Sequence, residues 1–185
     1  MPLKITFELE DKDLKYFKKQ MNMAKKAANL TSEADIIASA SEMMEQVSNI
    51  KIPDFVNQKI EVLGQLINML EDPEWPLSAA ERRNVVSALA YFAEPQDIIP
   101  DDVPILGFID DAIMIELVAI ELKHELDAYL DYCKYRTAEA ARKRTPNATR
   151  EQYIEAKRKA LQSRMRRRRK VSFSPTASRT RIRLF

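Results

Sequence analysis

Apolar side chains recur every three or four residues along most of this chain, which is the spacing of one face of an α-helix. Prolines, aspartates and asparagines interrupt the pattern and separate the helical stretches. The scarcity of glycine and the abundance of Ala, Leu, Met, Glu, Lys and Arg also favour helices. The predicted helices cover approximately residues 11–28, 32–48, 54–70, 79–92, 112–144 and 150–170.

The two ends of the chain carry a different pattern. Apolar and polar residues alternate from Leu3 to Leu9, which predicts a short N-terminal strand. The stretch from Arg179 to Phe185 alternates as well, with arginines opposite the acidic residues of the first strand. We hypothesise that the two ends pair as strands, within one chain or between two copies. The alternative is a tail that stays disordered until a partner binds.

These patterns predict an all-α fold, a helical bundle of about five or six helices with a short N-terminal strand and a basic C-terminal arm. We expect residues 1–80, the strand and first helices, to pack with a helical module at 80–145 as one domain. Residues 146–185 form a basic helix and a tail.

Two local signals mark the junction near residue 75. Ser78 and Glu81 have the spacing of a capping box, in which each side chain binds the backbone amide of the other residue. The only tryptophan, Trp75, lies in a turn between two prolines. We expect its indole to plug the end of the bundle rather than to bind a partner.

Charge is distributed very unevenly along the chain. Residues 1–141 contain 14 Lys and Arg against 26 Asp and Glu, a net charge of −12, whereas residues 142–185 contain 16 against 2, a net charge of +14. Nine of the fourteen residues from Lys157 to Lys170 are basic. These are Lys157, Arg158, Lys159, Arg164, Arg166, Arg167, Arg168, Arg169 and Lys170.

Three acceptors suit such a basic arm: nucleic-acid phosphates, anionic lipid head groups, or the acidic body of the same or another copy. Aromatic residues that stack on bases are sparse in the arm, so nucleic-acid binding through it would rest on backbone phosphates and have little sequence specificity. The single cysteine and the absence of an apolar signal or spanning stretch favour a cytoplasmic protein, peripheral at the inner membrane face if it binds lipid.

The segment from Tyr91 to Ile115 is rich in proline and aspartate. Its prolines fix the backbone φ angle and predict a stiff connection between two helices. Aspartates in such places usually accept backbone N–H bonds in turns or lie at helix starts, so we interpret them as structural. The alternative is a cation site, because hard cations prefer several carboxylates, and a catalytic pair is a further alternative. The carboxylates concerned are Asp97, Asp101, Asp102, Asp110 and Asp111.

The residues of this segment resemble a known family. The run Asp97-Ile98-Ile99-Pro100-Asp101, followed by Pro104-Ile105-Leu106-Gly107 and Asp110-Asp111, is similar to the signature of the YkvA-like family, a bacterial domain of unknown function. The resemblance covers roughly residues 80–125 and implies no established activity. Some relatives carry the motif beside membrane-spanning segments, so membrane association is suspected. The motif residues are Asp97, Pro100, Asp101, Pro104, Gly107, Asp110 and Asp111.

Taken with the charge distribution, the resemblance favours a non-enzymatic binding or adaptor protein whose arm engages a polyanion, with nucleic acid preferred. The alternative is a peripheral protein on an anionic membrane, and the third possibility is a metal-dependent enzyme at the aspartates. No cofactor is expected, and the terminal strands suggest a homo-oligomer.

Overall fold

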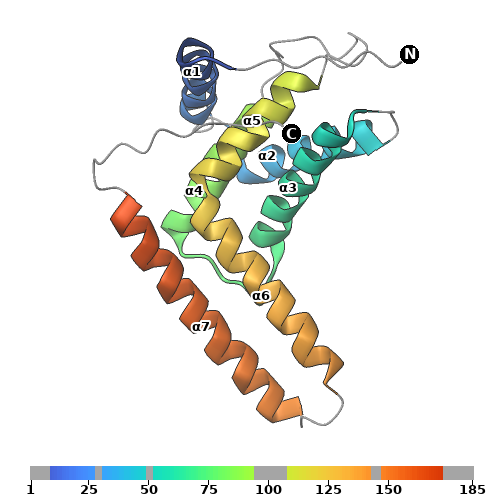
Figure 1. The fold of residues 1–185 in the computed structure, drawn as a ribbon, viewed down its shortest axis with the longest axis vertical. Coiled ribbons are helices and arrows are strands. Elements are labelled where there is room, and N and C mark those ends of the chain that lie inside the picture. Colours follow the sequence, from blue (N-terminus) through green and yellow to red (C-terminus); the bar gives the residue numbers. More distant parts are fainter. Residues whose placement is uncertain (1–8, 28–30, 49–51, 94–107, 143–146, 173–185) are drawn as a thin grey trace.

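The computed structural model describes residues 9–27, 31–48, 52–93, 108–142 and 147–172 (Figure 1). These ranges contain seven α-helices, one 3-10 helix and no strand, which confirms the all-α fold class. In chain order they are α1 (Asp11–Ala27), α2 (Glu33–Ser48), α3 (Asp54–Glu71), α4 (Ala79–Leu89), η2 (Ala90–Ala93), α5 (Ile109–Glu121), α6 (Lys123–Ala141) and α7 (Asn147–Ser172).

Helix α5 lies at the centre of the bundle and packs against α3, α1 and α6. Apolar residues occupy almost every face of this helix, and such a pattern requires burial on all sides. Asp110 and Asp111 are buried in its first turn, where carboxylates meet the positive end of the helix dipole. The apolar residues buried along α5 are Ala112, Ile113, Met114, Ile115, Leu117 and Val118.

The prediction of one long helix over residues 112–144 is wrong. The helix is interrupted at Leu122, which lies between α5 and α6 and has φ −96° and ψ 16°. Neither proline nor glycine lies at this junction, so the helical periodicity continues through it in the sequence. The two halves differ in their main packing partner: both contact α3, but α5 packs mostly on α3 whereas α6 packs mostly on α7. Figure 1 shows α6 and α7 extending together toward the end of the molecule opposite α1.

Most of the predicted N-terminal strand lies at residues 1–8, outside the described residues, and the predicted C-terminal strand at 179–185 also lies outside them. The pairing of the two ends therefore stays a prediction. Leu9 is described and packs, half-buried, against the core.

Candidate functional site: the basic helix and the body beneath it

All nine cations predicted to bind a polyanion lie on α7. The helix does not stand free of the body, because it packs along α6. Leu161 and Met165 are buried one turn apart and form the apolar centre of this contact, while Ile154 is half-buried nearer the start of the helix. The arm is thus anchored by a narrow apolar stripe on an otherwise very polar helix.

Polar side chains of α7 extend the same contact to the turn between α3 and α4. Gln162 is buried and its Nε2 donates to the carbonyl oxygen of Pro76 at 2.9 Å. One turn earlier, the Arg158 guanidinium donates to the carbonyl oxygen of Glu74 at 3.2 Å. Both bonds satisfy backbone acceptors that the turn leaves without a helical partner.

Three arginines of α7 form ion pairs with acidic residues of the body. Arg164 pairs with Asp131 at 2.6 Å, and both side chains are partly exposed. Arg166 pairs with Glu81 at 2.8 Å and Arg169 with Glu125 at 3.1 Å. The side chains of Glu81 and Glu125 are almost fully buried, so these two carboxylates depend on the arginines for charge compensation. Of the three acceptors left open by the sequence, the acidic body of the same chain is seen here.

Glu81 links the arm to the start of α4. The predicted capping box is present: the Ser78 hydroxyl accepts from the Glu81 amide at 3.3 Å, and the Ser78 amide donates to the Glu81 carboxylate at 2.9 Å. Burial raises the pKa of this carboxyl, but hydrogen bonds from Arg166 and Ser78 outweigh it and hold the pKa at about 2. Glu81 therefore stays ionised at neutral pH and holds the end of α7 against α4.

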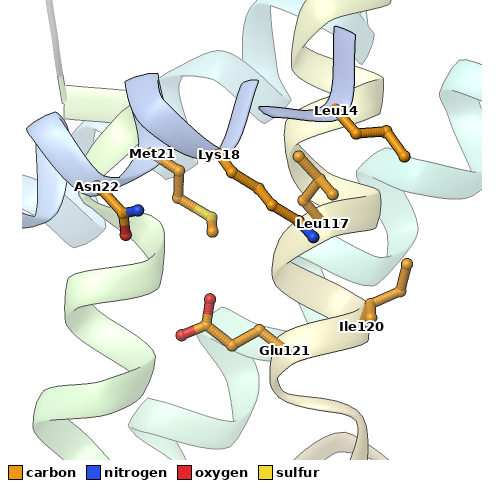
Figure 2. Close-up of a pocket in the computed structure, with 7 residues that line it drawn as sticks. All are labelled: Leu14, Lys18, Met21, Asn22, Leu117, Ile120 and Glu121. Carbon is orange, nitrogen blue, oxygen red and sulfur yellow. The ribbon is translucent and has the colours of Figure 1, made fainter. Parts of the chain in front are cut away.

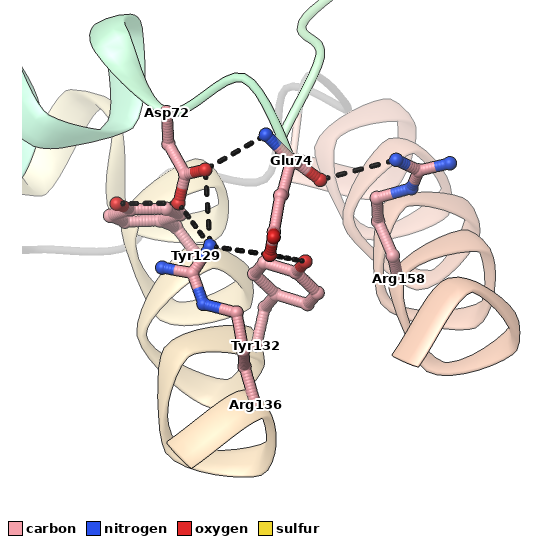
Figure 3. A network of polar contacts seen from close by, with 6 residues as sticks. All are labelled: Asp72, Glu74, Tyr129, Tyr132, Arg136 and Arg158. Carbon is pink, nitrogen blue, oxygen red and sulfur yellow. Dashed lines mark hydrogen bonds and ion pairs between the residues drawn. The ribbon is translucent and has the colours of Figure 1, made fainter. Parts of the chain in front are cut away.

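A polar network fixes the turn between α3 and α4 on α6 (Figure 3). The Tyr129 hydroxyl donates to Asp72 at 3.2 Å and the Tyr132 hydroxyl to Glu74 at 3.1 Å. Arg136 bridges both carboxylates, at 2.9 Å from each. Burial, together with the Glu74 carboxylate, raises the pKa of Tyr132 to about 12, so its hydroxyl remains a donor at neutral pH.

Trp75 lies within this turn and is 1% exposed, as expected for a side chain that plugs the bundle. Its ring centroid is 5.1 Å from that of Tyr132 and 5.8 Å from that of Tyr129. The carbonyl groups on either side of it, those of Glu74 and Pro76, are the ones that α7 binds. The tryptophan thus belongs to the surface on which the arm packs.

Several cations of the arm have side chains that are exposed to solvent. Six of the nine are exposed, and among them Arg166 also pairs with Glu81 and Lys159 with Glu155 of its own helix. The exposed cations are Lys157, Lys159, Arg166, Arg167, Arg168 and Lys170. We call this set the outer cations of α7; it is the part of the predicted polyanion site that remains accessible.

Most of the aspartate motif lies outside the described residues, namely Asp97, Pro100, Asp101, Pro104 and Gly107. Asp110 is described, and the Tyr91 hydroxyl donates to it at 3.4 Å from the end of η2. The residue before α5, Phe108, makes no side-chain capping bond. Asp110 and Asp111 lie in the first turn of α5, so they interact with the helix dipole and do not cap the helix. Within the described residues no group of three His, Cys, Asp or Glu is placed to hold a metal ion. A cation site involving Asp97 or Asp101 stays a prediction.

The partners of the arm were missed by sequence reasoning. Glu81 was identified only as a capping residue, and Glu125 and Asp131 were not singled out. No local pattern marks these three as partners, because the contacts are long-range: Arg166 and Glu81 are 85 residues apart, and Arg164 and Asp131 are 33 apart. The one available signal was the opposite net charge of body and arm.

The aspartate motif lies within the part of the chain that matches a known protein family. The sequence model of a family described as "Protein of unknown function (DUF1232)" matches residues 84–117, which run from α4 into α5. The chain is also 34% identical over 73 residues to "Uncharacterized membrane protein YkvA" of Bacillus subtilis (strain 168), a match that covers 39% of this chain and 69% of that protein. No solved structure matches. Among the described helices, none combines the length and apolarity needed to cross a membrane.

Proposed function

The chain belongs to the YkvA-like family, and from this premise we propose that it is a non-enzymatic protein that binds an anionic membrane surface peripherally through the outer cations of α7. The matched relative is called a membrane protein, and none of the helices described in this chain is long and apolar enough to cross a bilayer, so the proposal is attachment at the surface. The observation that carries the proposal is that α7 is held against the body and still has six exposed cations, of which Arg166 also pairs with Glu81.

Binding through this side requires no folding of the arm. The buried residues Leu161 and Met165 and the ion pairs to Glu81 and Glu125 already hold α7 as a helix against the body. A preformed cationic surface avoids the ordering entropy that a disordered basic tail loses on binding. Each Lys or Arg near an anionic bilayer contributes about 1 kcal/mol, so a few outer cations suffice for measurable attachment.

Exposed apolar groups on α7 favour lipid over nucleic acid. Tyr153 is 53% exposed and Val171 is 74% exposed, and they flank the outer cations along α7, one before and one after them. The phenol ring of tyrosine suits the interface between head groups and acyl chains, and a valine beside cations has the same preference for a bilayer surface. A phosphodiester backbone in water offers neither side chain an apolar partner.

Vesicle flotation tests the proposal. The full chain should float with vesicles that contain phosphatidylglycerol, should not float with phosphatidylcholine alone, and should dissociate as salt is raised. Reversing two outer cations, Arg167→Glu with Lys170→Glu, should weaken binding at least tenfold, since each lost cation accounts for roughly 1 kcal/mol. The matched control is Lys123→Glu with Lys134→Glu, the same change of charge at two exposed positions of α6.

Equal weakening by the control pair would show that only the net charge matters and would overturn the assignment to α7. The nucleic-acid hypothesis is tested with the same four variant positions on duplex DNA. If the protein binds duplex DNA tightly and in a salt-sensitive way but does not float with anionic vesicles, the nucleic-acid hypothesis replaces the membrane proposal.

A further inference from the structure

A groove of about 350 Å³ lies between α1 and α5, on a part of the molecule that the membrane proposal does not use (Figure 2). Met21 and Leu117 are buried at its base, whereas Leu14 and Ile120 are half-buried along its sides. Four aliphatic side chains from two helices thus line one continuous apolar surface that is open to water.

The polar groups at the groove carry one excess positive charge. The Glu121 carboxylate is compensated by Lys25, whose Nζ lies 2.5 Å and 2.7 Å from its two oxygens. Lys18 also lines the groove, and Figure 2 shows its ammonium directed across it toward Leu117. No ion pair to Lys18 occurs among the described residues. Asn22, one turn further along α1, adds an amide that can donate a hydrogen bond.

We propose that this groove binds a single-chain anionic amphiphile, a fatty acid, with its alkyl chain on Leu14, Met21, Leu117 and Ile120. The carboxylate accepts hydrogen bonds from the Lys18 ammonium. A charged end and an apolar chain match the two chemistries that the groove combines, and a wholly polar ligand would leave the aliphatic surface in water.

The volume of the groove and the positive charge of α1 indicate which kind of amphiphile fits. A volume of about 350 Å³ is near the lower limit of small-molecule sites, so it suits one alkyl chain better than the paired chains of a membrane phospholipid. Helix α1 carries six lysines against two aspartates, and this local positive field attracts an anionic head group to the open side of the groove.

Titration of the full chain with monomeric laurate, in buffer without vesicles, tests the proposal by calorimetry. Lys18→Gln should weaken laurate binding about tenfold, the loss of one charge-assisted hydrogen bond of about 1.4 kcal/mol. Lys19→Gln is the matched control, because it makes the same change at the neighbouring exposed position of α1, which does not line the groove. The control should bind within about twofold of the wild type, as expected for a change in the distant field alone.

A second variant tests the apolar part. Ile120→Trp places a larger side chain in the groove and should abolish binding while leaving the helical circular dichroism unchanged. Affinity should also rise about fifteenfold at each step from octanoate to decanoate to laurate, because each step buries two further methylenes. Absence of laurate binding, or binding that Lys18→Gln and Ile120→Trp leave unchanged, overturns the proposal. Since no membrane is present in this titration, its outcome is separate from that of vesicle flotation.

Discussion

Helices α1 and α7 are both strongly basic, yet they attach to the acidic body by different chemistry. Helix α1 is lysine-rich and buries three apolar residues, Phe17, Met21 and Ala24, while its lysines remain at the surface except for Lys25, which is partly covered. Helix α7 is arginine-rich, and two of its arginines reach carboxylates that are almost fully buried. The first helix is held by a hydrophobic stripe and the second by a stripe reinforced with ion pairs.

The difference follows from the two cations. A guanidinium is planar, weakly hydrated and always charged, so it tolerates partial burial and presents several donors to a carboxylate. The ammonium of lysine is compact and strongly hydrated, and it tends to remain in water on a flexible stem. A count of basic residues therefore overestimates the surface available to an external polyanion on an arginine-rich helix that packs on acidic neighbours.

The largest expected effect comes from breaking a buried pair of α7. Arg169→Ala leaves the Glu125 carboxylate buried, with 3% of its side chain exposed, and without this partner. We expect a loss of about 3 kcal/mol in the free energy of unfolding, measured by urea denaturation. Arg167→Ala, an exposed position on the same helix, should change it by less than about 0.5 kcal/mol.

Adding Glu125→Gln to Arg169→Ala should restore part of the stability, because the buried charge is then absent. Equal unfolding free energies for Arg169→Ala and the wild type would mean that the ion pair does not hold α7, and the contrast between the two helices would disappear.

An intermediate effect should appear as pH is lowered. The pKa of Glu81 in the folded protein is about 2, below its ordinary value of 4.5, so its ion pair stabilises the fold fully at higher pH. The two pKa values alone correspond to about 3 kcal/mol, and because the partner Arg166 is 49% exposed, solvent screening reduces the contribution to roughly 2 kcal/mol. It should be lost as pH falls from about 4.5 to 2. We expect Glu81→Gln to be less stable than the wild type at pH 6 and equally stable near pH 2. A constant difference in unfolding free energy across this range would refute the assigned pKa.

The smallest effect should come from the ion pair of α1. Lys25 and Glu121 are both partly exposed, so Lys25→Ala should lower the free energy of unfolding by only about 0.2–1 kcal/mol. The difference should vanish in about 1 M salt, where screening acts over roughly 3 Å. A loss as large as that for Arg169→Ala would show that lysine and arginine pairs stabilise their helices equally, contrary to the comparison.

Features encoded over a few neighbouring residues were predictable from the sequence. Amphipathic spacing located the helices of the bundle, because burial of one face repeats every turn. The capping box at Ser78 and Glu81 also formed as expected, since its hydrogen bonds span only three residues. The burial of Trp75 followed from the same local reasoning.

Features that depend on distant contacts were not predictable. The break at Leu122 has no local signal and separates two helices whose main packing partners differ. The docking of α7 requires Glu81 and Asp131 to lie beside arginines far away in the chain, which periodicity does not encode. For the aspartate motif, the structure describes only Asp110 and Asp111, so their role at the start of α5 is the part that it tests.

The position of Trp75 allows its intrinsic fluorescence to be used to follow the attachment of α7. Because there is one tryptophan and α7 binds the carbonyl groups on both sides of it, the emission spectrum reports directly on whether that helix is in place. We expect detachment of α7 to loosen the turn that holds the indole and therefore to change its emission and its access to quenchers in solution. Stopped-flow mixing with vesicles could then follow, in unlabelled protein, whether the arm keeps its place on the body when it meets a membrane.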